Sequence, residues 1–139
     1  MARHPIQVVS LIGMPGSGKS TVGVLLAKRL GLAFVDTDLL IQEQEQATLA
    51  EIIAANGHEA LRVIEEHVLL NMDIGASVIS TGGSVVYSEA IMNRLSNASS
   101  VIYLRSQLAT VEYRISLAPD RGIASPGSHT LQDVYNERV

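Results

Sequence analysis

The chain has 139 residues, the length of one domain, and its 47% apolar content excludes a disordered polypeptide. A formal net charge of −4 without any basic run argues against a nucleic-acid-binding surface. The sequence has no cysteine, which excludes disulfides, thiolate metal sites and thiol nucleophiles, and no apolar stretch is long enough to span a membrane.

The first predicted elements are a buried strand over 6–12 and a helix over 22–30, which Gly31 ends. The strand leads directly into a glycine-rich loop, so we expect no cleaved signal peptide and a cytoplasmic protein. A second strand is predicted over 32–38. We expect the helix to face the core with its larger apolar side chains, Val22, Leu25, Leu26 and Leu30.

The sequence of the middle part of the chain predicts two helices, followed by two strands with a short helix between them. Thr48 and Glu51 form a capping-box pattern before the first helix, which ends at Asn56-Gly57. The second helix has one apolar face, made of Leu61, Ile64, Val68 and Leu69. Strands are then predicted over 77–81 and 100–105, on either side of a short helix capped by Ser88.

The C-terminal part predicts a helix capped by Ser106, a polar loop over 117–129, and a last helix starting near Thr130. Loops of this length are often lids or binding loops. We therefore expect the segment 117–129 to be a lid that closes during the reaction and excludes water.

Alternation of strands and helices predicts a parallel sheet covered on both faces, that is, a three-layer α/β/α domain over 1–139 with four strands. In such folds ligands bind beyond the carboxyl ends of the strands. Unusual residues follow three of the predicted strands: a glycine-rich stretch, then two aspartates, then Gly82-Gly83.

The glycine-rich stretch Gly13-x-x-x-x-Gly18-Lys19-Ser20 matches the P-loop pattern between a strand and a helix, which predicts a P-loop nucleoside-triphosphate-hydrolase-like fold that binds ATP. Glycines let backbone N–H groups approach phosphate oxygens, and the helix directs its positive dipole end at the same anion. Lys19 supplies a charge to the phosphates, and Ser20 offers its hydroxyl to Mg²⁺. The nucleotide-binding residues are predicted to be Gly16, Ser17, Gly18, Lys19, Ser20 and Thr21.

Asp36 and Asp38 end the second predicted strand, and side chains two apart in a strand point the same way. Beside a P-loop, one carboxylate suits Mg²⁺ and the other the acceptor hydroxyl, and the metal-side carboxylate would join the Ser20 hydroxyl there. The alternative is that the two acids cap the next helix.

Other polar residues stay ambiguous from spacing alone. Arg62, Glu65 and Glu66 have the spacing of ordinary ion pairs on an exposed helix face. Gly82-Gly83 is either a plain turn or a place where a ligand approaches backbone N–H groups. Arg114 and Arg121 are either surface charges or residues that reach ATP.

Taken in order, the P-loop, "FVDTD", "GHEALRVIEE", "STGG", "YLR", a lid with one arginine and "ERV" resemble the shikimate kinase family over the whole chain. The resemblance implies phosphorylation of shikimate by ATP. It assigns Asp36 to Mg²⁺ through water, and Asp38 to the acceptor hydroxyls and the catalytic proton. It further implies these roles: Arg62 and Arg138 for the substrate carboxylate, Glu65 for orienting Arg62, Gly82 and Gly83 for backbone contacts, Arg114 near adenine, and Arg121 on the transferring phosphate with Lys19.

Three residues depart from the family's pattern: Ser84 replaces a glycine, Leu61 a phenylalanine and Gly122 a proline. We expect each to touch the substrate pocket or the lid, with Ser84 placing a side chain where the substrate lies. The family also continues past "ER" with a fifth strand and a final helix.

The prediction is a monomeric small-molecule kinase that uses ATP and Mg²⁺ and binds neither nucleic acid nor membrane. Two alternatives stay open. One is a P-loop kinase for another small hydroxy acid or sugar acid, and the other is a non-catalytic ATP-binding module.

Overall fold

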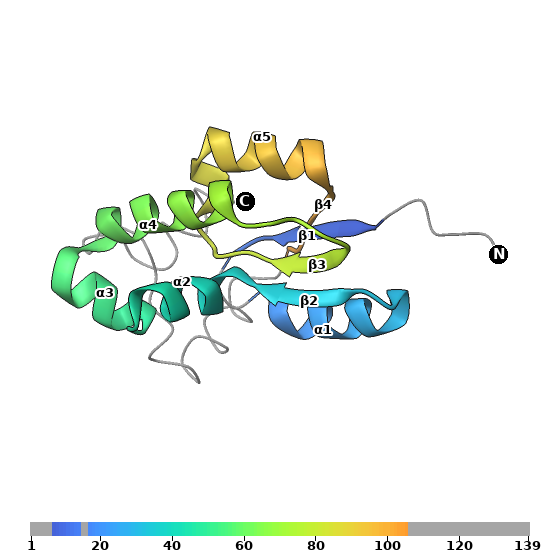
Figure 1. Cartoon of the computed structure of the whole chain (residues 1–139), viewed down its shortest axis with the longest axis horizontal. Coiled ribbons are helices and arrows are strands. Elements are labelled where there is room, and N and C mark those ends of the chain that lie inside the picture. The colour runs from blue at the N-terminus through green and yellow to red at the C-terminus, as the bar shows by residue number, and fades with distance from the viewer. Residues whose placement is uncertain (1–6, 15–16, 106–139) are drawn as a thin grey trace.

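The computed structural model describes residues 7–14 and 17–105, which contain a four-stranded parallel sheet. The strands are β1 (Val8–Ile12), β2 (Ala33–Asp36), β3 (Ser77–Ser80) and β4 (Ser100–Tyr103), in the order β2-β3-β1-β4. All four pair in parallel, and Figure 1 shows β2 and β3 side by side and running in the same direction. The predicted parallel α/β fold is confirmed for these residues.

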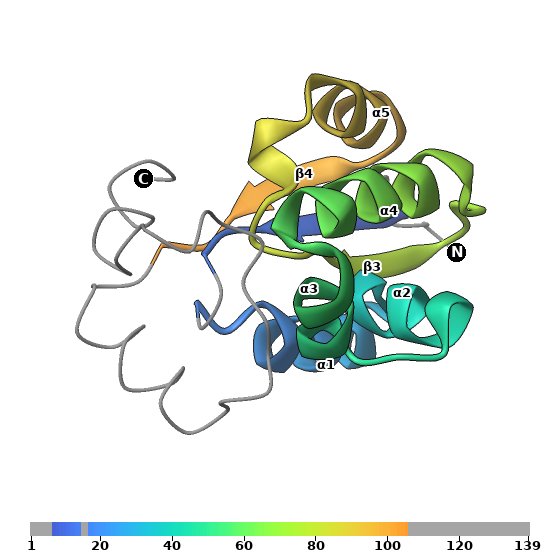
Figure 2. The same ribbon diagram turned by 90° about the vertical axis from the view of Figure 1, so that its left-hand side faces the viewer.

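The helices lie on both faces of the sheet. They are α1 (Lys19–Leu30), α2 (Thr37–Glu45), α3 (Leu49–Asn56), α4 (His58–Asn71) and α5 (Glu89–Ala98), with a 3-10 turn, η1 (Val85–Tyr87), before α5. Figures 1 and 2 show α5 and α4 on one side of the sheet and α1 on the other. Among the described residues, no helix is both long and apolar enough to cross a bilayer.

The side of the sheet that faces α4 and α5 holds the larger core, which also includes residues of α2 and α3. Its fully buried side chains include Ile41 on α2, Leu69 on α4 and Leu95 on α5. The predicted apolar face of α4 is confirmed, because Leu61 and Val68 are buried in the same cluster. Burial of this kind stabilises by about 1.5–3 kcal/mol per large side chain.

The opposite face is covered by α1, and here the predicted packing is correct for Leu26 and Leu30, which pack against the core cluster of this face, and wrong for Val22 and Leu25. The helix meets the sheet through Gly23 and Ala27, whereas Val22 and Leu25 are 41% and 62% exposed. Close approach explains the difference: a Cβ built on Gly23 would lie 2.6 Å from Cε1 of Phe34. Small residues are needed where the helix touches the strands, and Val22 and Leu25 therefore stay outside this contact.

Several helix ends follow the local signals in the sequence. Gly31 ends α1 in a left-handed conformation, with φ 68°. Thr48 and Glu51 form the predicted capping box of α3, and Ser88 caps α5 by accepting a hydrogen bond from the Ile91 N–H.

The second predicted strand is too long. It ends at Asp36, and α2, which was not predicted, begins at Thr37. The Leu-, Glu- and Gln-rich stretch 39–45 has the composition of a helix, and that signal was available. The elements predicted within 106–139, including the lid at 117–129, lie outside the described residues.

Candidate active site

Two glycines give the P-loop its shape. Gly13 has φ 150°, and a Cβ there would lie 2.5 Å from the Leu104 carbonyl oxygen. Gly18 occupies the N-cap of α1 with φ 97° and offers no side-chain cap. The first N–H groups of a helix have no intrahelical partners, so this terminus is well suited to bind an anion.

Lys19 lies inside the loop that it follows. Its Nζ donates hydrogen bonds to the carbonyl oxygens of Gly13 at 2.7 Å and Met14 at 2.8 Å, and the residue is only 8% exposed. The backbone N–H of Ser17 also donates to the Met14 carbonyl, at 3.1 Å. The lysine therefore places a buried positive charge within the loop and holds its backbone in a compact form.

Oxygen atoms from three elements meet beside the first turn of α1. The Ser20 hydroxyl donates to Oδ2 of Asp36 at 3.2 Å and lies 3.4 Å from the Ser80 hydroxyl. Hard oxygen donors of this kind fit Mg²⁺, which usually keeps several waters and takes few protein ligands. The described part of the chain has no group of three or more His, Cys, Asp or Glu that could hold a metal ion.

Asp36 and Asp38 do not share a strand face, which corrects the period-two argument. Asp36 is the N-cap of α2, and its Oδ1 accepts the Asp38 N–H at 2.9 Å. Asp38 lies in the first turn of that helix. The capping alternative is therefore correct for Asp36, and the same carboxylate still reaches the P-loop serine through its other oxygen.

A second group of polar residues gathers around Gly82, just after β3. A Cβ built on Gly82 would lie 2.5 Å from Oε2 of Glu65 and 3.0 Å from Oδ1 of Asp38. Helices α2 and α4 and the loop after β3 therefore bring two carboxylates to one point. Glu65 is only 5% exposed, and its Oε1 accepts a hydrogen bond of 2.7 Å from the Ser84 hydroxyl.

The surroundings of Arg62 differ from those of an ordinary surface ion pair. Its guanidinium carbon lies 4.6 Å from the centre of the Tyr87 ring, within the range of a cation–π contact. Ser84 is 5% exposed, and its hydroxyl donates to Glu65. Leu61 is buried in the core cluster. The expectation that these two residues touch the substrate pocket stays a prediction.

The structure thus places seven predicted site residues in the two groups just described, namely Ser17, Gly18, Lys19, Ser20, Asp36, Asp38 and Gly82, and sets Arg62 beside Tyr87. Thr21 is exposed on the first turn of α1, and Gly83 is half-buried in the turn after β3. Gly16, Arg114, Arg121, Gly122 and Arg138 lie outside the described residues. Sequence reasoning missed the contacts of Ser80, Ser84 and Tyr87, for which no sequence pattern was available.

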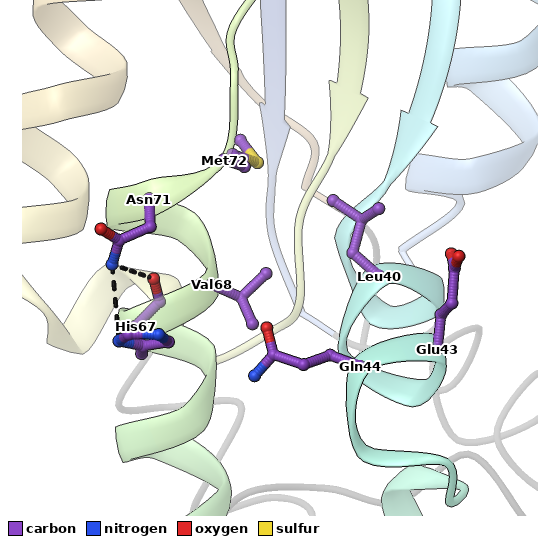
Figure 3. A pocket seen from close by; sticks show the side chains of 7 residues that line it. All are labelled: Leu40, Glu43, Gln44, His67, Val68, Asn71 and Met72. Atoms are coloured by element: carbon purple, nitrogen blue, oxygen red, sulfur yellow. Dashed lines mark hydrogen bonds between the residues drawn. The ribbon is translucent and has the colours of Figure 1, made fainter.

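A separate open groove of about 440 Å³ lies between α2 and α4 (Figure 3). It is lined by Leu40, Glu43, Gln44, His67, Val68, Asn71 and Met72. Asn71 donates to the His67 backbone carbonyl at 2.7 Å, as the dashed line shows. None of the residues predicted for catalysis lines this groove.

Comparison with known proteins gives a consistent family. A family model for shikimate kinase matches residues 15–138. Shikimate kinase 2 of Yersinia pseudotuberculosis is 36% identical over 114 residues, which cover 82% of this chain and 66% of that protein. The shikimate kinase of Paracidovorax citrulli is 35% identical over 141 residues, which cover 98% of this chain and 77% of that protein. The match to the Yersinia relative thus spans just under two thirds of that protein.

Solved structures point the same way. Shikimate kinase from Acinetobacter baumannii in complex with shikimate matches with a TM-score of 0.83 at 27% identity, over 95% of this chain and 74% of that one. Shikimate kinase from Aquifex aeolicus matches with a TM-score of 0.77, also at 27% identity, over 94% of this chain and 79% of that one.

Proposed function

Since this chain belongs to the shikimate kinase family, we propose that it transfers the γ-phosphoryl group of ATP to shikimate, giving shikimate 3-phosphate and ADP. One observation carries the proposal. Asp36 accepts the P-loop Ser20 hydroxyl through Oδ2 and caps, through Oδ1, the helix that carries Asp38. A phosphate-binding loop and an acceptor-side carboxylate are thereby joined by a single side chain.

On the nucleotide side, the backbone of residues 16–21 would hold the phosphates, and Lys19 would supply a positive charge. Ser20 would ligate Mg²⁺, with Asp36 beside it, mainly through water. The metal, when bound, neutralises charge on the phosphate oxygens. Support comes from the all-oxygen surroundings of Ser20 and from the buried position of the Lys19 ammonium within the loop.

On the acceptor side, we assign Asp38 to hold the reacting hydroxyl and to accept its proton as the phosphoryl group is transferred. Arg62 and Arg138 would bind the substrate carboxylate, because a guanidinium matches a carboxylate with two parallel hydrogen bonds. Gly82 and Gly83 would donate backbone N–H groups to the substrate. Support comes from the convergence of Asp38 and Gly82 in one place.

The remaining assignments rest on the family resemblance. Arg121 would contact the transferring phosphate from the lid at 117–129, and Arg114 would lie near adenine. The protein would act as a cytoplasmic monomer in aromatic amino-acid synthesis, without nucleic acid or membrane. A kinase for another small hydroxy acid is the second candidate, because Ser84 and Leu61 depart from the family's pattern.

The test is ADP release from Mg·ATP with shikimate as acceptor. Gluconate, a nucleoside monophosphate and buffer without acceptor are the parallel reactions. We expect release that depends on shikimate and that rises to saturation with its concentration. Release with gluconate alone would favour the second candidate, and nucleotide binding without release under any condition would contradict both kinase proposals.

A further inference from the structure

The segment after β3 contacts α4 through a series of side chains, and this arrangement goes beyond the family assignment. Ser84 donates its hydroxyl hydrogen to Glu65 at 2.7 Å. Three residues later, the Tyr87 ring lies 4.6 Å from the Arg62 guanidinium carbon. Two residues of one short segment thus contact Glu65 and Arg62. The family resemblance assigns Arg62 to the substrate carboxylate and Glu65 to orienting that arginine.

A third contact anchors the same segment at its end. Ser88 donates its hydroxyl to Oε2 of Glu66 at 3.2 Å while also capping α5. The segment begins at Gly82, next to the Asp38 and Glu65 carboxylates. It therefore lies against α4 over its length, and its position relative to that helix is fixed at both ends.

The two side chains on α4 need such support for physical reasons. A buried carboxylate is costly unless hydrogen bonds satisfy it, and the Ser84 hydroxyl supplies one to Glu65, which is 5% exposed. A free arginine samples many rotamers, and a ring packed on the guanidinium restricts them before any ligand binds. Prior restriction of this kind favours binding, because less order has to be created on association.

We infer that Ser84 and Tyr87 are positioning residues, which hold Glu65 and Arg62 in the orientation in which Arg62 receives the carboxylate of the acceptor. The inference rests on the proposed function for the identity of that acceptor. Neither residue takes part in the chemical step. Ser84 keeps one oxygen of Glu65 occupied while the other lies beside Gly82, and Tyr87 keeps the Arg62 guanidinium packed on its ring.

The first variant tests the ring. Tyr87→Leu removes the aromatic face but keeps an apolar side chain, whereas Tyr87→Phe keeps the ring. We expect Tyr87→Leu to raise the KM for shikimate about 2- to 5-fold, the range of an exposed cation–π contact, with kcat and the KM for ATP unchanged. Tyr87→Phe should behave as the unmodified protein. Val63→Ala, at a 70% exposed position next to Arg62 in the sequence, is the matched control.

The second variant tests the hydroxyl. Ser84→Ala leaves a buried carboxylate without this donor, and we expect the KM for shikimate to rise on the order of 10-fold. A normal KM for ATP would show that the variant is folded. In the double variant with Tyr87→Leu, the effects on KM should be non-additive, because both act on residues within one turn of α4.

A readout independent of turnover separates this inference from the proposed function. The side-chain Nε–H signal of Arg62 should carry a ring-current shift that Tyr87→Leu removes and Tyr87→Phe keeps. Loss of that shift, without phosphorylation of shikimate by the unmodified protein, would overturn the proposed acceptor but support the positioning role. An unchanged Arg62 signal in Tyr87→Leu, or equal changes in both KM values, would overturn the inference.

Discussion

The nucleotide side and the acceptor side of the site are built in different ways. The nucleotide side uses consecutive residues, and Lys19 closes the loop with hydrogen bonds to residues five and six positions earlier. The acceptor side takes Asp38 from α2, Glu65 from α4 and Ser84 from the segment after β3. A site formed mainly by backbone groups (a backbone-built site) tolerates little change in geometry. A site formed by side chains from separate elements (a side-chain-built site) can change its specificity one residue at a time.

The largest effect on the nucleotide side is expected from Lys19→Ala. Loss of the cation removes charge from the phosphates and also the hydrogen bonds that hold the Gly13 and Met14 carbonyls. We expect nucleotide binding to weaken and turnover to fall about 10³- to 10⁵-fold, the range for a cation on a transferring phosphoryl group. Steady-state kinetics and nucleotide titration measure both effects. Turnover at the original rate would contradict a P-loop mechanism.

Asp38→Asn tests whether the two sides are separable. Asparagine keeps the shape but accepts no proton, so turnover should fall about 10²- to 10⁴-fold with ATP affinity nearly intact. Titration with a non-hydrolysable ATP analogue is the control. If ATP affinity falls as far as turnover does, Asp38 belongs to the metal side, and the division drawn above is incorrect.

Gly13→Ala probes the rigidity of the nucleotide side. The new Cβ would lie 2.5 Å from the Leu104 carbonyl, and that backbone is fixed because its N–H donates to Ile12 at 2.8 Å. We expect a loss of about 2–3 kcal/mol in the free energy of unfolding, from overpacking and an unfavourable φ. Urea denaturation measures it, and a stability equal to that of the parent would show that the loop is more adaptable than its contacts indicate.

Gly82→Ala is the matched change on the acceptor side. Here the 2.5 Å contact is with the Glu65 carboxylate, a side-chain end that can move if it leaves Ser84. We expect a smaller loss of stability than for Gly13→Ala, about 1 kcal/mol, together with a roughly 10-fold higher KM for shikimate. Equal losses of stability in the two alanine variants would remove the contrast between a backbone-built and a side-chain-built site.

Thr48→Ala is the control for a loss of stability that involves neither the nucleotide side nor the acceptor side. It removes the N-cap of α3, whose hydroxyl accepts the Glu51 N–H at 3.1 Å. We expect a loss of about 1 kcal/mol in the free energy of unfolding and unchanged kinetic constants. A change in either KM would mean that α3 supports the site more directly than its capping contacts suggest.

The same contrast explains what sequence reasoning could predict. The P-loop residues are neighbours in the chain, so their spacing alone identified Lys19 and Ser20. The pairing of Arg62 with Tyr87 depends on how the segment after β3 lies on α4, which no local pattern encodes. Spacing alone therefore favoured a solvated ion pair for Arg62, and only the family resemblance assigned it to a substrate.

Errors in the fold have a related origin. The helical pattern of α1 correctly predicted a helix and the inward position of Leu26 and Leu30, but not the contact through Gly23, which packs closely against Phe34. Apolar periodicity predicts that large side chains face inward. At this close helix–sheet contact the buried positions are Gly23 and Ala27, and Val22 and Leu25 stay exposed. The strand predicted over 32–38 runs two residues too far, because Asp36 is both the last residue of β2 and the N-cap of α2, with extended backbone at φ −106° and ψ 113°.

The position of β1 in the sheet has a consequence for synthesis of the chain. Val8 on β1 pairs with Ser77 of β3, and Val9 pairs with Ser100 of β4 on the other side. At about 5–20 residues per second, the ribosome exposes β1 several seconds before either neighbour exists. Pairing of β1 therefore depends on contacts with residues distant in sequence, which are slow to form. Of the two inner strands, β1 is made before β3 but is paired on both edges only once β4 is present, and Gly13 of the phosphate loop gains its close neighbour, the Leu104 carbonyl, only then.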